Sequence, residues 1–197
     1  MGIAQKMSVN KKAVIASVEK HEQNLIDISD KIWALAETAF EETQSSKILA
    51  DYAESQGMKV ERGVAGMPTA FVASYGSGSP VISVLGEFDA LPGISQKAKP
   101  TKDPLVPNGN GHGCGHNLFG AGSLGAAIAI KELIEQRKIK GTVKFFGTPS
   151  EEKFFGKIWM VKAGLWNDVD VNISWHPAPV TESDVQSSLA LVDFKVE

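Results

Sequence analysis

The sequence has little of several features that would assign a protein to a class at once. It contains a single cysteine, Cys114, in 197 residues, so an internal disulfide is excluded. Lysine and arginine number 20 against 23 aspartate and glutamate residues, and neither sign forms a long block. This balance offers no surface for nucleic acid or for an anionic membrane. No predicted strand is followed by a phosphate-binding loop or a dinucleotide fingerprint, which argues against a nucleotide-binding protein.

Long apolar runs are also scarce. Residues 1–12 are polar and charged and lack the apolar centre of a signal peptide. No later stretch reads as apolar enough to span a bilayer, so the sequence predicts a cytoplasmic location. Because 43% of the residues are hydrophobic, the chain can still bury the core of one domain and the start of a second.

Helical and strand patterns alternate along the chain. Apolar residues recur at helical spacing over residues 9–35, where His21 is interpreted as a solvent-facing residue, and over residues 41–55. Strands are expected at 58–64, 69–75, 81–86, 142–147 and 169–175, and further helices at 117–136 and 156–165. This order predicts an α/β fold with a mostly parallel central sheet flanked by helices. The apolar strand 81–86 is expected near its centre.

Four polar clusters follow predicted strands or begin a helix. They are Glu87-Phe88-Asp89, His112-Gly113-Cys114-Gly115-His116, Glu151-Glu152 and His176. The carboxyl ends of strands line the ligand crevice in open α/β sheets, so we expect the clusters to converge. The stretch 91–113, rich in Pro, Gly, Asn and Lys, is too long for a simple connection, which favours a functional role.

Cys114 and His116 are the pair that points most directly to a metal. A thiolate and an imidazole separated by one glycine suit zinc or a similar transition metal, and an added carboxylate makes a mixed ligand set for one or two ions. Taken alone, the pair would fit a buried cysteine in a glycine-rich turn beside a helix-capping histidine. The other three clusters favour the metal site.

The acidic pair has two interpretations. Neighbouring side chains on a turning segment point in different directions, so one of Glu151 and Glu152 can bind metal while the other takes a proton from water. The alternative is an acidic helix start, favoured by the helix dipole. Likewise, His176 can be a ligand or a hydrogen-bonded strand-end histidine, and Asp89 can orient a ligand histidine or form a turn.

Together, the segments Gly86–Pro92, His112–Asn117, Gly147–Glu152 and Trp175–Pro177 resemble the aminoacylase and carboxypeptidase-like metallohydrolase family. The likeness is greatest to the amidohydrolase branch whose metal site uses a cysteine. Within that branch, the insert before His112 and the run 108–120 are similar to the B-type subunits of aminobenzoyl-glutamate hydrolases. The resemblance covers nearly the whole chain.

The resemblance implies a set of roles for these residues. Two divalent ions, Mn²⁺ or Zn²⁺, would be held by Cys114, His116, Glu152 and His176. Glu151 would be the general base and Asp89 would support the site, whereas His112 is not a clear ligand. The implied reaction is hydrolysis of an amide bond to a free amino acid, with p-aminobenzoyl-glutamate as the expected substrate. An N-acyl-amino-acid hydrolase, a dipeptidase or a non-catalytic subunit are the alternatives, and the intact base argues against the last.

The resemblance also bears on organisation and partners. Residues 1–187 are expected to be the N-terminal part of the catalytic domain, and residues 188–197 the first strand of an inserted dimerisation domain. A last metal-binding histidine would then lie outside this chain, so the chain alone is expected to be nearly inactive. The whole protein is expected to pair with itself or with a related subunit. Lys153-Phe154-Phe155 departs from the small residues usual after the acidic pair, and would crowd the site or reshape substrate choice.

Overall fold

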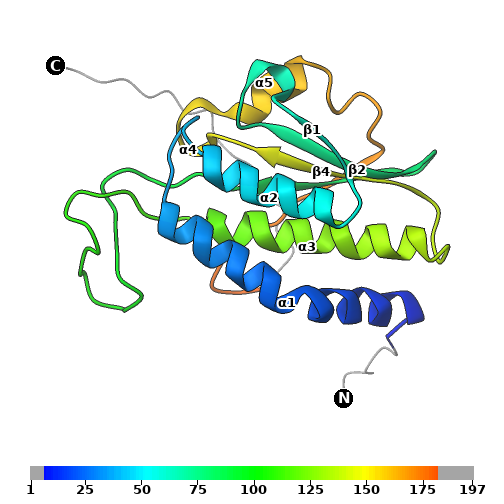
Figure 1. The fold of residues 1–197 in the computed structure, drawn as a ribbon, viewed down its shortest axis with the longest axis horizontal. Helices are drawn as coiled ribbons and strands as arrows, with labels where there is room; N and C mark the ends of the chain where they lie inside the picture. Colours follow the sequence, from blue (N-terminus) through cyan, green and yellow to red (C-terminus); the bar gives the residue numbers. More distant parts are fainter. Residues whose placement is uncertain (1–6, 182–197) are drawn as a thin grey trace.

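The computed structural model describes residues 7–181, which form one sheet with helices on both faces (Figure 1). The helices are α1 (Val9–Leu35), α2 (Thr43–Ser55), the 3-10 turn η1 (Val64–Gly66), α3 (His116–Glu135), α4 (Glu151–Phe154) and α5 (Gly156–Lys162). The strands are β1 (Lys59–Arg62), β2 (Phe71–Ser77), β3 (Val81–Glu87), β4 (Gly141–Thr148) and β5 (Val171–Ile173). The predicted strand in residues 188–197 lies outside the described residues.

The five strands are arranged in the order β1-β2-β4-β3-β5. The pairings of β3 with β4 and with β5 are parallel, and the pairings of β2 with β1 and with β4 are antiparallel. The predicted α/β fold with flanking helices is therefore confirmed, with a sheet that is mixed in direction. β3 is an interior strand as expected, and β4 occupies the middle position.

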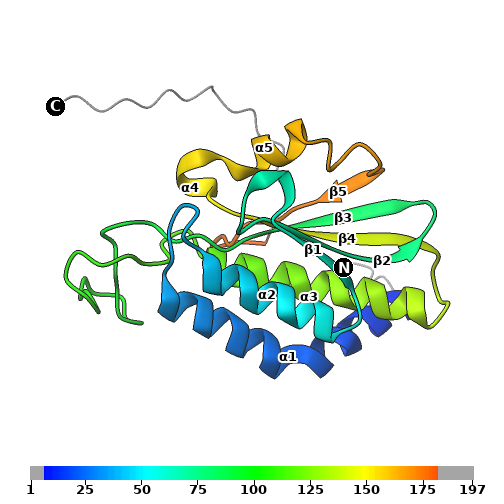
Figure 2. The ribbon, with the colours of Figure 1, turned by 45° about the horizontal axis from the view of Figure 1, so that its top comes forward.

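Helices cover the two faces of the sheet unequally (Figure 2). On one face, α2 and α3 pack against the strands and α1 packs on the outside of α3. The larger core lies between them and the sheet, with Phe71, Leu124 and Phe145 fully buried. On the other face, α5 and η1 cover a smaller core around Phe146 and Met160.

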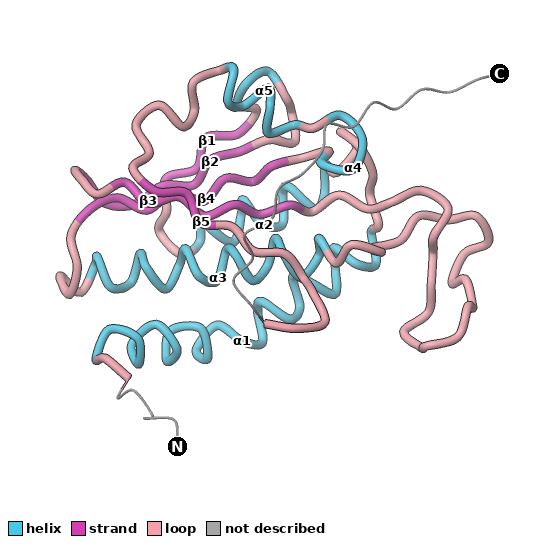
Figure 3. Tube along the Cα trace, turned by 180° about the vertical axis from the view of Figure 1, so that it is seen from behind, coloured by secondary structure: helices cyan, strands magenta, loops and turns pink. Residues whose placement is uncertain are grey.

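Helix α3 is more apolar than the sequence pattern indicated. Within residues 7–181 it is the one helix whose length and hydropathy would suffice to cross a membrane. However, 67% of that apolar window is buried inside the fold. The helix lies between α1 and the sheet, which is the position of a core helix in a layered fold (Figure 3).

His21 contradicts the prediction that it faces solvent. It is 5% exposed, on the side of α1 that faces α2 and α3. Its Nδ1 atom lies 2.8 Å from the Tyr52 hydroxyl, and its Nε2 atom lies 3.1 Å from a carboxylate oxygen of Glu132. The apolar periodicity located the inner face of α1 correctly, but periodicity cannot reveal a buried polar residue whose partners come from two other helices.

Candidate metal centre

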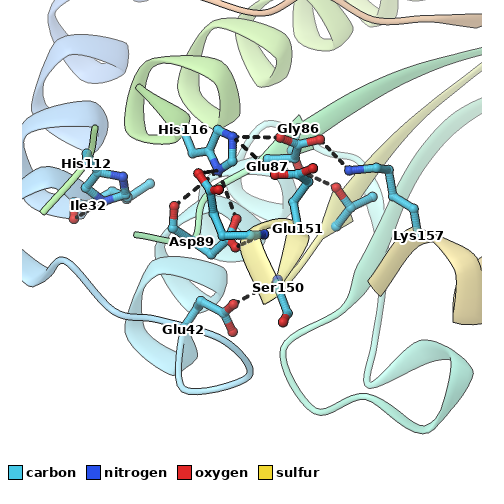
Figure 4. A network of polar contacts seen from close by, with 12 residues as sticks. Ile32, Glu42, Gly86, Glu87, Asp89, His112, His116, Ser150, Glu151 and Lys157 are labelled. Atoms are coloured by element: carbon cyan, nitrogen blue, oxygen red, sulfur yellow. Dashed lines mark hydrogen bonds and ion pairs between the residues drawn. The ribbon is translucent and has the colours of Figure 1, made fainter. Parts of the chain in front are cut away.

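Two parallel strands and one helix start deliver the polar side chains to a single edge of the sheet. β3 and β4 run side by side in register, with Glu87 opposite Thr148. Asp89 follows β3, and Ser150 leads from β4 into α4. The helix α3 begins at the same edge with His116, as Figure 4 shows. The predicted convergence at the carboxyl ends of the strands is what the fold produces.

His116 lies at the centre of the cluster and is 1% exposed. Its Nδ1 atom lies 2.9 Å from Oδ1 of Asp89 in a hydrogen bond. With the ring proton on Nδ1 and directed at Asp89, the other nitrogen presents a lone pair. That nitrogen, Nε2, lies 2.8 Å from Oε2 of Glu87 but makes no hydrogen bond within residues 7–181.

The adjacent carboxylates of α4 face different sides of the His116 ring. An oxygen of Glu151 lies 3.9 Å from Nε2, and an oxygen of Glu152 lies 3.8 Å from Nδ1. The backbone N–H of Glu152 donates to Oδ2 of Asp89 at 2.9 Å. Asp89 thus connects the histidine with the acidic pair through its two oxygens. The pair also begins a helix, so the two sequence interpretations describe the same residues.

Two groups of three donor atoms share His116. One joins Cys114, His116 and His176, and the other joins Glu87, His116 and Glu151, with the donor atoms of each group within 4.8 Å of one another. The ring of His176 is exposed and stands edge-on to that of His116 at a centroid distance of 5.5 Å. Five donor residues from four segments therefore surround one point of the fold.

The acidic surroundings shift the pKa values of the neutral-pH groups upward. Burial disfavours the charged imidazole, yet hydrogen bonds and negative charges from Asp89 and Glu87 outweigh it and raise the pKa of His116 to about 10. Hydrogen bonding to Glu152, followed by burial and by the neighbouring carboxylates, raises the pKa of the Cys114 thiol to about 12. Both groups therefore favour an added positive charge at this position.

Glu151 and Glu87 are shifted in opposite directions. Burial and then the charge of Glu87 raise the pKa of Glu151, which makes it a stronger base than an exposed carboxylate. For Glu87 burial alone would raise the pKa, but the hydrogen bond with His116 and the charge of Lys157 lower it. Lys157 forms an ion pair with Glu87 from α5.

The residues present fit a pair of divalent transition-metal ions. Nε2 of His116 and Oε1 of Glu152 are buried without a hydrogen-bond partner in the described part of the chain, as expected of atoms kept for a cation. Sulfur, imidazole and carboxylate donors together suit zinc or manganese better than calcium or magnesium. Within residues 7–181, the ion pairs of these carboxylates involve only His116 and Lys157, which leaves a surplus of negative charge.

Three residues of this edge were missed or given no role by sequence reasoning. Glu87 stood inside a quoted motif, but as a strand end it looked structural, whereas it belongs to a donor group. Lys157 and Glu42 reach the edge from α5 and from the start of α2. No local spacing signals either one, because their partners are 70 and 108 residues away in the sequence.

His112 and the bulky residues after the acidic pair lie apart from the donor groups. Nε2 of His112 lies 3.1 Å from the backbone oxygen of Ile32, so this ring braces the end of α1. The ring of Phe154 stacks on Phe40 at 5.4 Å and nearly parallel. It thereby lines a hollow of about 380 Å³ with Met67 and other residues.

Comparison with known proteins assigns the chain to a family. Residues 84–192, more than half of the chain, match the model of peptidase family M20/M25/M40. The chain belongs to this family. The recognition of a dinuclear metallohydrolase family from the four motifs is thereby confirmed.

Individual M20 relatives and structures agree with the assignment. A p-aminobenzoyl-glutamate hydrolase of Escherichia coli K12, in its B-type subunit, is 49% identical over 164 residues, which are 82% of this chain and 34% of that protein. The mouse Xaa-Arg dipeptidase is 28% identical over 89% of this chain and 40% of its own length. The crystal structure of a dinuclear metal-binding M20 peptidase from Bacillus subtilis superimposes with a TM-score of 0.71 at 26% identity, covering 82% of this chain and 44% of that one. The M20 chain thus spans roughly a third to two fifths of the length of the curated relatives it matches.

Proposed function

We propose that this chain supplies most of a dinuclear metal centre that hydrolyses an amide bond to a free amino acid. The observation that carries the proposal is the buried ring of His116, shared by two groups of three donor atoms. Asp89 fixes one nitrogen of that ring, and the other nitrogen has no hydrogen bond within residues 7–181. The family to which the chain belongs supports the same chemistry.

The proposed ligands are Cys114, His116, Glu152 and His176, and Mn²⁺ or Zn²⁺ is the proposed metal. Glu87 joins this set as a neighbouring donor because its carboxylate approaches Nε2 of His116. Divalent ions, when bound, polarise a carbonyl group and lower the pKa of water. Asp89 acts behind the ligands, since it orients the His116 ring and holds the backbone of Glu152.

Glu151 is the proposed general base. Its carboxylate is partly buried, lies beside the His116 ring and has a raised pKa. A carboxylate in this position can take a proton from water as it attacks the amide carbonyl, and can then pass that proton to the departing amine. The nucleophile is water, so no covalent bond to the chain is required.

The proposed substrate is p-aminobenzoyl-glutamate. This assignment draws on the Escherichia coli relative, which is 49% identical and bears that substrate in its name. Cleavage of the amide would give p-aminobenzoate and glutamate. A second candidate is hydrolysis of a dipeptide or an N-acyl amino acid, favoured by the similarity to the Xaa-Arg dipeptidase and to a Bacillus subtilis N-acetylcysteine deacetylase. A homodimer or a complex with a related subunit stays a prediction, as does the cytoplasmic location.

A chimera tests the activity. The N-terminal third of the Escherichia coli relative is replaced by residues 1–197, and the purified protein is checked for folding by circular dichroism. Release of p-aminobenzoate from p-aminobenzoyl-glutamate in the presence of Mn²⁺ is then measured, with Glu151→Gln as the variant and the unaltered Escherichia coli protein as the control. The proposal predicts turnover that Glu151→Gln abolishes. A folded, metal-loaded chimera that cleaves only dipeptides or N-acetyl amino acids would favour the second candidate, and one that cleaves none of them would contradict the proposal.

A further inference from the structure

The connection between α1 and α2, residues 36–42, braces the loops that carry the site. The backbone N–H of Ala90, in the loop after β3, donates to the backbone oxygen of Glu37 at 2.8 Å. The side-chain amide of Asn110, in the long loop before α3, donates to the backbone oxygen of Ala36 at 3.1 Å. The connection thus holds two of the three segments from which the donor residues come.

The third segment is held by a side chain, that of Glu42. The backbone N–H of Ser150 donates to Oε1 of Glu42 at 2.8 Å. Glu42 stands at the N-cap position of α2, yet its carboxyl makes no hydrogen bond to its own helix. The carboxylate of Glu37 caps α2 instead, accepting from the N–H groups of Gln44 and Ser45 at 3.1 and 2.8 Å. Glu42 is therefore released from the usual role of an N-cap residue.

Ser150 has a backbone conformation that requires support. Its φ of 54° and ψ of 44° lie in the left-handed region, which non-glycine residues seldom adopt. Ser150 also caps α4, where its hydroxyl accepts from the N–H of Phe154 at 3.3 Å. Glu151 and Glu152 follow directly, so the direction of both carboxylates depends on the geometry of this one residue.

The surroundings of Glu42 are unfavourable for a carboxylate that serves only the fold. The side chain is 0% exposed, and its second oxygen has no hydrogen-bond partner within residues 7–181. Burial, with the charge of Asp89 as a lesser cause, raises the pKa of Glu42 to about 7. Figure 4 shows the carboxyl directed at Ser150, on the opposite side of that loop from His116. An apolar residue would cost the fold less at this position, unless the bond to Ser150 serves the site.

We propose that Glu42 is a positioning residue: its buried carboxyl holds Ser150 in the left-handed conformation from which Glu151 and Glu152 are directed at the donor cluster. The inference rests on the proposed function, because it assigns Glu42 a role in arranging that metal centre. Glu42 itself touches neither the donor atoms nor a substrate. It acts through one hydrogen bond to the backbone.

Three variants of the 197-residue chain separate this role from a general contribution to folding. Glu42→Ala removes the hydrogen bond, and Glu42→Gln keeps an oxygen that can accept it. Glu37→Ala is the matched control, since it removes a carboxylate from the same connection but one that caps α2. Each is studied metal-free by hydrogen exchange of the peptide 148–155, and then by titration with Co²⁺, whose visible absorption reports the ligand geometry.

The proposal predicts faster exchange of the Ser150 amide and an approximately 10- to 100-fold weaker Co²⁺ affinity in Glu42→Ala. Glu42→Gln should retain the wild-type exchange and absorption band, and Glu37→Ala should lose stability with an unchanged band. A folded Glu42→Ala with wild-type exchange and affinity would overturn the inference, as would a folded Glu42→Gln that loses the band. If the wild-type chain gives no Co²⁺ band that depends on Cys114, the metal centre of the proposed function fails, and the exchange measurement still decides whether Glu42 holds Ser150.

Discussion

Glu42 also predicts how the stability of the metal-free chain depends on pH. Its pKa is raised from 4.5 to about 7, chiefly by burial. The folded state therefore holds the proton more tightly than the unfolded state, and the associated stability is present below about pH 4.5 and is lost as the pH rises through 7. The difference between the two pKa values corresponds to roughly 3 kcal/mol, of which about 2.5 kcal/mol falls between pH 5 and pH 8.

The Glu42→Gln variant isolates this contribution, because its side chain has the shape of the neutral acid and does not titrate. We expect the free energy of unfolding of Glu42→Gln to gain on the wild type by about 2.5 kcal/mol between pH 5 and pH 8. Urea denaturation with a chelator present measures both proteins. Glu41→Gln, at the exposed neighbouring residue, shows how much of the gain comes from net charge alone. Parallel pH curves for Glu42→Gln and wild type would refute the reasoning.

Two further substitutions test the packing that supports the site. His21→Leu should lower the free energy of unfolding by about 2–3 kcal/mol, because it removes the buried partner of Tyr52 and Glu132, whereas Lys20→Met at the exposed partner of Glu132 should cost under about 1 kcal/mol; equal losses in urea denaturation would contradict the buried cluster. Gly147→Ala should cost about 1–3 kcal/mol, because the added Cβ would meet the ring of Phe71 at 2.1 Å. An unchanged denaturation midpoint for Gly147→Ala would show that the ring can move aside.

Much of the fold was predictable because its signals are local. Helical spacing located α1, and the apolar runs located β3 and β4, since burial of one face leaves a periodic pattern in the sequence. The direction of β2 was not predictable in this way. The strand follows β1 and precedes β3 in the sequence, yet β4 separates it from β3 and pairs with it antiparallel. Only packing of the whole sheet decides that order.

The candidate site divides in the same manner. Cys114, His116 and the acidic pair were identifiable because unusual residue types stand together in the sequence. Glu42 and Lys157 were not, since a lone carboxylate or lysine at a helix start is commonplace and acquires a role only through a distant partner. His21 was misread for the same reason. Sequence patterns therefore predicted the residues around His116 better than the residues that hold them in place.

Metal content is the most direct test of the central claim that this chain forms a metal centre. The chain is loaded with Mn²⁺ or Zn²⁺, dialysed, and analysed for bound metal beside Cys114→Ser and Glu152→Ala, with Glu37→Ala as a control for stability. We predict that the wild type and the control retain about one or more ions per chain and that both ligand variants lose them. No retained metal in the wild type, or equal retention in the ligand variants, would contradict the assignment of the cluster around His116 as a metal site.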